Sequence, residues 1–132
     1  MRKFDLDDIM IMAAFENITG TGVRDCLIKE VIYFLVDKGK AGLAIGKSGQ
    51  KIKAAEDMLG RPIKIFEWAD SSIELIKSMI PSAKQITLNK GTATVMVESK
   101  FRGTVIGKEG SNVKVIKEFL DRNTDIKELK IL

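Results

Sequence analysis

The chain has 132 residues, with 22 Lys or Arg against 18 Asp or Glu, and 45% of its residues are hydrophobic. This composition is typical of a folded protein, and the length allows one ordinary core or two cores of about 60 residues each. Histidine is absent and Cys26 is the single cysteine, which excludes an intrachain disulfide, a His/Cys zinc site and the usual nucleophile–base pair, so we expect no enzyme, no metal and no cofactor.

The first half predicts, in chain order, a helix, two strands, a glycine-rich loop flanked by helices, and a third strand. Acidic residues near residues 5–8 suit the positive end of the first helix, and β-rich runs indicate the strands. After the loop, apolar residues at i, i+3 and i+7 indicate another helix. The predicted bounds are a helix over about 6–18, strands over 25–29 and 31–36, a helix carrying Ile52, Ala55 and Leu59, and a strand over 62–66.

The second half predicts the same order of elements. Its first helix begins at the capping box Ser71-Ser-Ile-Glu74 and ends before Pro81. The remaining elements are strands over 85–89 and 92–97, a helix carrying Val113, Ile116 and Leu120, and a strand over 127–131. We therefore expect two domains, 1–69 and 70–132.

An internal repeat links the two halves. Residues 42–53 align without gaps on residues 103–114, and six of the twelve positions are identical, so chance is a poor explanation. Each copy lies in a basic stretch: residues 38–53 contain five lysines and no acid, and residues 100–117 contain five cations and one acid, Glu109. A single charge run is usually a solvated surface, but two matching runs favour a shared anionic ligand.

The repeated Ile-Gly-Lys-x-Gly sequence has a physical use. Glycines adopt unusual backbone angles and let another backbone approach closely, and the following helix offers its N-terminal N–H groups to an anion. A lone Gly-x-x-Gly would more simply be a tight helix–helix turn. The segment Gly42–Ser48 also approaches the phosphate loop of nucleotide hydrolases but is one residue short, and the second copy has Glu109 in place of the Ser or Thr. The aromatic residues mostly fall at core spacings and predict no exposed stacking surface.

Ala44-Ile-Gly-Lys-Ser-Gly49 and Val105-Ile-Gly-Lys-Glu-Gly110 resemble the GxxG signature of KH domains, and the helix and strand placed before each core resemble the type II arrangement. The tandem spacing is similar to that of archaeal NusA-like transcription factors. The resemblance implies an α+β fold of two tandem type II KH domains, each a small three-stranded mixed sheet packed on about three helices.

The resemblance further implies a transcription elongation or termination factor that grips nascent single-stranded RNA through both loops, with the first loop dominating because Glu109 opposes phosphate binding. Ile45, Ile52, Ile106 and Val113 lie beside the loops, and for each we favour core packing over base contact. The RNA-binding residues implied are Ile45, Gly46, Lys47, Ser48, Gly49, Lys51, Lys53, Ile106, Gly107, Lys108, Glu109, Gly110 and Lys114.

Two other functions stay open: a KH protein of ribosome assembly or RNA processing, and a protein-interaction module without RNA binding. RNA polymerase also stays open as a partner, because no polymerase-binding domain is recognisable before the first KH unit. No run approaches the roughly 20 apolar residues of a membrane span, and the N-terminus lacks a signal-peptide pattern. We therefore expect a cytoplasmic monomer with no membrane contact.

Overall fold

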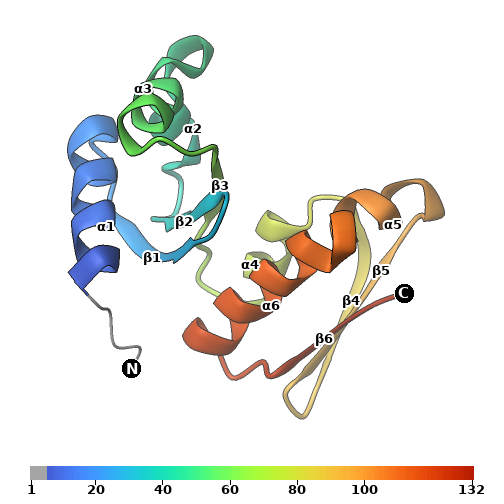
Figure 1. Cartoon of the computed structure of the whole chain (residues 1–132). Coiled ribbons are helices and arrows are strands. Elements are labelled where there is room, and N and C mark those ends of the chain that lie inside the picture. Colours follow the sequence, from blue (N-terminus) through green and yellow to red (C-terminus); the bar gives the residue numbers. More distant parts are fainter. Residues whose placement is uncertain (1–5) are drawn as a thin grey trace. The chain divides into compact units, whose positions relative to one another are not determined.

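The computed structural model describes residues 6–132, which divide between Asp70 and Ser71 into two compact units (Figure 1). We call residues 6–70 the first unit and residues 71–132 the second unit. Each unit combines one three-stranded mixed sheet with helices. The predicted α+β class is therefore confirmed.

The first unit forms the sheet β1-β2-β3. Its elements are α1 (Leu6–Thr19), β1 (Val23–Ile28), β2 (Ile32–Val36), α2 (Ala41–Ile45), α3 (Gln50–Leu59) and β3 (Ile63–Glu67). Strands β1 and β2 are antiparallel, whereas β2 and β3 are parallel. A parallel pair needs a crossover connection, and α2, the glycine loop and α3 supply it.

The second unit repeats this topology with the sheet β4-β5-β6. Its elements are α4 (Ser72–Met79), β4 (Ala83–Asn89), β5 (Thr92–Val97), α5 (Ser99–Ile106), α6 (Ser111–Asn123) and β6 (Glu128–Ile131). The hairpin β4–β5 is antiparallel and the β5–β6 pair is parallel. The predicted cap is confirmed on its serine side, because Ser71 Oγ accepts a hydrogen bond of 3.1 Å from the Glu74 N–H.

Most predicted bounds lie within two residues of the observed ones, and the differences have local causes. The first helix continues to Thr19, whose hydroxyl donates to the Phe15 carbonyl, and it ends where Gly20 takes a φ of 72°. Strand β1 starts at Val23, two residues before the predicted start at residue 25. An irregularity between Val23 and Asp25 interrupts the pairing of β1 with β2. Such a bulge breaks the regular alternation of side chains along a strand, so the sequence pattern of a strand is weaker there.

The core of the first unit lies between the sheet and the helices α1 and α3, which Figure 1 shows beside the strands. Phe15 of α1 stacks on Phe34 of β2 with ring centroids 4.0 Å apart, and both side chains are fully buried. Ala55 of α3 is also fully buried, and so small a residue lets α3 lie close to its neighbours. This packing fixes the start of α3, and therefore the end of the glycine loop.

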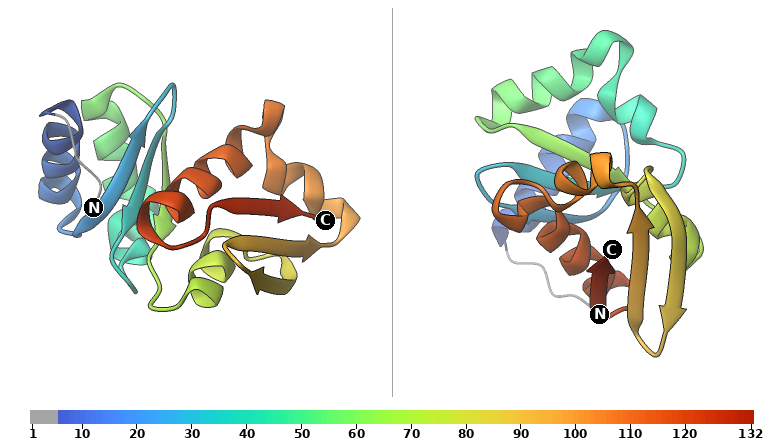
Figure 2. Two further views of the ribbon diagram at one scale, coloured as in Figure 1. Left: turned by 90° about the horizontal axis from the view of Figure 1, so that it is seen from below. Right: turned by 90° about the vertical axis from the view of Figure 1, so that its right-hand side faces the viewer.

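The core of the second unit lies on one face of its sheet. Ala93, Val95 and Val97 of β5 are buried, while Met96 between them is exposed, which is the alternation of a sheet covered on one side. Helices α4 and α6 lie beside the sheet (Figure 2). Their buried side chains include Ile76 and Phe119. The position of α6 on this core fixes the second glycine loop in the same way as α3 fixes the first.

An ion pair near the end of the first unit allows a test by pH titration. Lys38 Nζ lies 2.6 Å from Asp70 Oδ2, and this hydrogen bond, together with the lysine charge, lowers the pKa of the Asp70 carboxyl below its ordinary value of 3.8. Because the folded-state pKa is lowered, the stabilisation is present above pH 3.8 and is lost as the pH falls through the lowered pKa. Both side chains are exposed, so the gain in stability is small.

We expect Lys38→Met to return the pKa of Asp70 to its ordinary range, measured by NMR titration of the Asp70 carboxyl carbon. Lys29→Met, which removes an exposed lysine from the β1–β2 turn, serves as the control and should leave that pKa unchanged. An Asp70 pKa that stays equally low in Lys38→Met would show that this ion pair is not its cause.

Candidate nucleic-acid interface

The two glycine loops have the same backbone conformation. In the first loop, Gly46–Gly49, the φ/ψ angles are 79°/173° at Gly46, 55°/27° at Ser48 and 74°/16° at Gly49. In the second loop, Gly107–Gly110, the corresponding angles are 78°/170°, 57°/27° and 75°/14°. No angle differs by more than 3°, so the repeat seen in the sequence is also a repeat of structure.

The first glycine of each loop is required for two reasons. Its angles fall in a region that only glycine populates readily. A Cβ added at Gly46 would also lie 2.8 Å from Lys51 Cγ and 3.0 Å from the Lys51 backbone nitrogen, and one at Gly107 would lie 2.8 Å from the Asn112 nitrogen. The loop therefore passes against the first turn of the following helix with no room for a side chain.

Backbone hydrogen bonds hold each loop in place. The Gly46 N–H donates to Gly42 O at 3.0 Å and the Gly49 N–H donates to Gly46 O at 3.1 Å; in the second unit the Gly107 and Gly110 N–H groups donate to the matching carbonyls at 2.8 and 3.1 Å. No side chain caps α3 or α6, whose N-caps are the last glycines of the loops. The positive end of each helix is thus available to an external anion.

Exposed side chains set the charge at the loop tips. Lys47 and Ser48 are exposed in the first loop, and Lys108 and Glu109 are exposed in the second. The first tip is therefore a lysine beside a hydroxyl, and the second is a lysine beside a carboxylate. Phosphate is attracted to both helix ends, but Glu109 repels it at the second.

The structure separates the other predicted cations by their contacts. Lys53 is exposed one turn into α3. Lys51 is half-buried, and its ammonium donates to the Thr19 carbonyl at the end of α1 at 3.2 Å. Lys114 donates to the Glu109 carbonyl of its own loop at 3.2 Å. Lys51 therefore joins two helices of the first unit.

The four apolar residues beside the loops differ in burial, and Ile52 packs against the core of the first unit as expected. Ile52, Ile106 and Val113 are half-buried, whereas Ile45 is 40% exposed. The expectation of core packing is wrong for Ile45, because its neighbour Ala44 is the residue of α2 that faces the core and is fully buried. Ile45 instead offers an apolar surface next to the first loop.

The two units use different side-chain hydrogen bonds to hold the helix that follows the glycine loop. In the second unit, Asn112 Nδ2 donates to the Val105 carbonyl of α5 at 2.8 Å and so joins α5 to α6 across the loop. The aligned residue of the first unit is Lys51, which bonds to α1 instead. The two loops have the same backbone conformation, but different side chains hold them in place.

One exposed aromatic residue was missed at the level of sequence. Phe101, in the first turn of α5, is 40% exposed, although its apolar character suggested core packing. Trp68 is only half-buried, and the Arg24 guanidinium lies 4.4 Å from the centroid of its ring. The remaining aromatic residues within positions 6–132 are buried.

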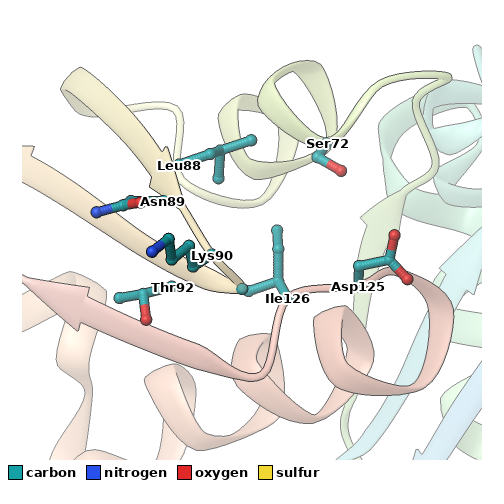
Figure 3. Close-up of a pocket in the computed structure, with 8 residues that line it drawn as sticks. Ser72, Leu88, Asn89, Lys90, Thr92, Asp125 and Ile126 are labelled. Atoms are coloured by element: carbon teal, nitrogen blue, oxygen red, sulfur yellow. The ribbon is translucent and has the colours of Figure 1, made fainter.

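A pocket of about 260 Å³ lies at the β4–β5 turn (Figure 3). It is lined by Ser72, Leu88, Asn89, Lys90, Gly91, Thr92, Asp125 and Ile126. None of these residues belongs to either glycine loop, so the pocket is not part of the predicted RNA surface. Within residues 6–132 we find no group of three or more Cys, Asp or Glu side chains that could hold a metal ion, and no helix there is both long and apolar enough to cross a membrane.

A family model and several named proteins match the chain. The family model described as "KH domain" matches residues 10–89, a range that includes the first loop and ends before the second. Proteins named "Probable transcription termination protein NusA" are similar to the chain: that of Methanocaldococcus jannaschii is 28% identical over 98% of this chain and 75% of its own length, and that of Methanococcus vannielii is 29% identical over 98% and 79%.

A solved structure shares the arrangement of the chain. The crystal structure of APE1850 matches with a TM-score of 0.80 and 28% identity, covering 98% of this chain and 100% of its own. Together, these similarities confirm the resemblance that the sequence predicted.

Proposed function

We propose, because this chain belongs to the KH domain family, that it binds single-stranded RNA through two tandem type II KH domains and acts in transcription elongation or termination. The domains would be residues 1–69 and 70–132, each with one GxxG loop. The observation that carries the proposal is that both loops share one glycine-dependent backbone and present an exposed lysine, Lys47 or Lys108.

The proposed contact combines charge and shape. A phosphate of the RNA would lie against the loop, near the lysine and the uncapped start of α3 or α6. The missing side chains of the glycines would let the RNA backbone approach closely. Unstacked bases would then reach the apolar surface next to the loop, including the exposed Ile45 of the first unit. A KH loop of this type clamps about four nucleotides.

The role in transcription is proposed from the relatives, whose printed name is that of a transcription termination protein. Nascent RNA is the single strand that such a factor would meet. We propose that the chain acts as a monomer, because each unit has its own buried core and carries its own loop.

The salt dependence of binding tests whether RNA is the ligand. We expect the full chain to bind a fluorescein-labelled single-stranded RNA 12-mer pool in an anisotropy titration. The slope of log K against log salt should be about −2 or steeper, because each phosphate contact on a single strand contributes about −0.7. Absence of binding at 50 mM salt, or a slope near zero, would contradict RNA binding and favour a protein partner.

A further inference from the structure

We propose that Phe101 is a stacking site for one unstacked base of the bound RNA, so that the second unit contributes an aromatic base contact that the first unit lacks. The inference rests on the proposed RNA-binding function and adds a position to it. It starts from the single exposed aromatic side chain within residues 6–132, which lies in the helix that leads directly into the second loop.

Exposure of Phe101 has no evident structural purpose. A phenyl ring has no polar group to place in water, and burying one is strongly favourable. The other five described phenylalanine and tyrosine rings are all buried. The Phe101 ring, in the helix that precedes the second loop, stays 40% exposed and so has surface that a ligand can cover.

One cation lies over this ring, and it also pairs with Glu98 at 3.7 Å. Lys100 Nζ lies 5.1 Å from the centroid of the Phe101 ring, and the Lys100 side chain is 71% exposed. Arg102 follows in sequence and is exposed, and its guanidinium donates to the Ile131 carbonyl at 3.4 Å. Aromatic rings that stack on bases, next to cations that follow the backbone, are the usual means of binding single strands without strong sequence preference.

The ring belongs to a helical turn that only the second unit has. On the repeat alignment, Arg102 corresponds to Ala41, the first residue of α2, so Ser99–Phe101 extend α5 by three residues relative to α2. Phe101 corresponds to Lys40. Gly107 comes six positions after Phe101, a rise of about 9 Å along a helix, so the ring and the loop lie within the reach of one short RNA segment.

A base contact at Phe101 would offset the weaker phosphate binding proposed for the second loop. Glu109 places a carboxylate where the first loop has Ser48, and the two residues share the same backbone angles. Phosphate binding at this tip is therefore weaker, and a stacked base would compensate without any charge. The first unit would offer a base only the aliphatic surface at Ile45, whereas the second would also stack a base on an aromatic ring.

The test compares Phe101→Leu, which keeps an apolar side chain but removes the aromatic face, with Phe101→Tyr, which keeps that face. Leu88→Ala is the matched control, because Leu88 is 41% exposed and lies outside both loops. Each full-length variant, checked for folding by circular dichroism, is titrated with a fluorescein-labelled oligoadenylate 12-mer and with 12-mers carrying a single abasic site at successive positions.

We expect Phe101→Leu to lose roughly tenfold in affinity, the order of one base–aromatic stack, while Phe101→Tyr and Leu88→Ala bind like the wild type. One abasic position should weaken wild-type binding by the same factor and should have no further effect on Phe101→Leu. In addition, crosslinking wild-type protein to 4-thiouridine RNA should map to the peptide that contains Phe101, a result that does not depend on any variant being stable.

Equal affinity of Phe101→Leu and wild type, with binding still lost on mutation of the first loop, would overturn the stacking site and leave the proposed function standing. Crosslinks that never fall on the Phe101 peptide would also overturn the stacking site. If the wild type binds neither the oligoadenylate 12-mer nor the RNA 12-mer pool, the proposed function fails and the stacking site fails with it.

Discussion

Replacing Lys47 and Ser48 together by aspartate is expected to weaken RNA binding at least about tenfold, or ~1.4 kcal/mol, without unfolding the protein. The change puts two carboxylates at the tip where a phosphate is proposed to bind, next to the uncapped start of α3. The backbone should tolerate it, because Glu109 adopts in the second loop the same left-handed angles that Ser48 has in the first. Anisotropy with the single-stranded RNA 12-mer pool measures the loss.

The control for this variant must change the net charge equally at a distant place. Lys29→Asp/Arg61→Gln lowers the charge by three, as does Lys47→Asp/Ser48→Asp, and both residues lie beyond the far end of α3, where Arg61 Nη1 donates to Lys29 O. We expect this control to lose little affinity. If the two variants lose affinity equally, only general charge attracts the RNA and the loop has no specific role.

The second loop gives a graded version of the same experiment. Lys108→Asp should reduce affinity less than the change in the first loop, because Glu109 already weakens phosphate binding there. Conversely, Glu109→Ser would recreate the tip of the first loop on an almost identical backbone, and it should increase affinity. The two loops of the chain thus serve as references for each other.

The sequence predicted the order of elements and the loops because both depend on local signals. Apolar periodicity and the Ser71 cap are properties of neighbouring residues, and the repeat of Gly46 and Gly49 in Gly107 and Gly110 reflects a backbone that only glycine adopts easily. These signals are read without knowledge of distant contacts. They therefore agree with the structure to within a few residues.

The side chains around the loops depended on contacts that the sequence does not reveal. Lys47 and Lys51 have the same chemistry and lie four residues apart, yet Lys47 is exposed while Lys51 bonds to Thr19, which lies 32 residues earlier. Phe101 appeared to be a core residue because apolar character alone does not distinguish the inner from the outer side of a short helix. The three-residue extension of α5, which places this ring, has no counterpart in the first copy of the repeat.

Gly46→Ala is expected to lower the free energy of unfolding of the first unit by roughly 2 kcal/mol or more and to weaken the RNA contact made by the first loop. The new methyl group would lie 2.8 Å from Lys51 Cγ and 3.0 Å from the Lys51 nitrogen, so the loop must move away from α3 or α3 must shift. Urea denaturation followed by the fluorescence of Trp68, the single tryptophan of the chain, reports on the first unit.

Two other glycines of the same segment separate steric cost from backbone strain. A Cβ at Gly49 would meet only Ile52 Cγ2 at 3.9 Å, so Gly49→Ala carries the strain of a φ of 74° alone and should cost about 1 kcal/mol. At Gly42, inside α2, a Cβ would have nothing within 4 Å and φ is not positive, so Gly42→Ala should be neutral or stabilise by up to about 1 kcal/mol. Equal losses in all three variants would mean that the close approach of the loop to α3 is not what requires Gly46. The predicted order instead makes that approach the reason that each loop begins with glycine.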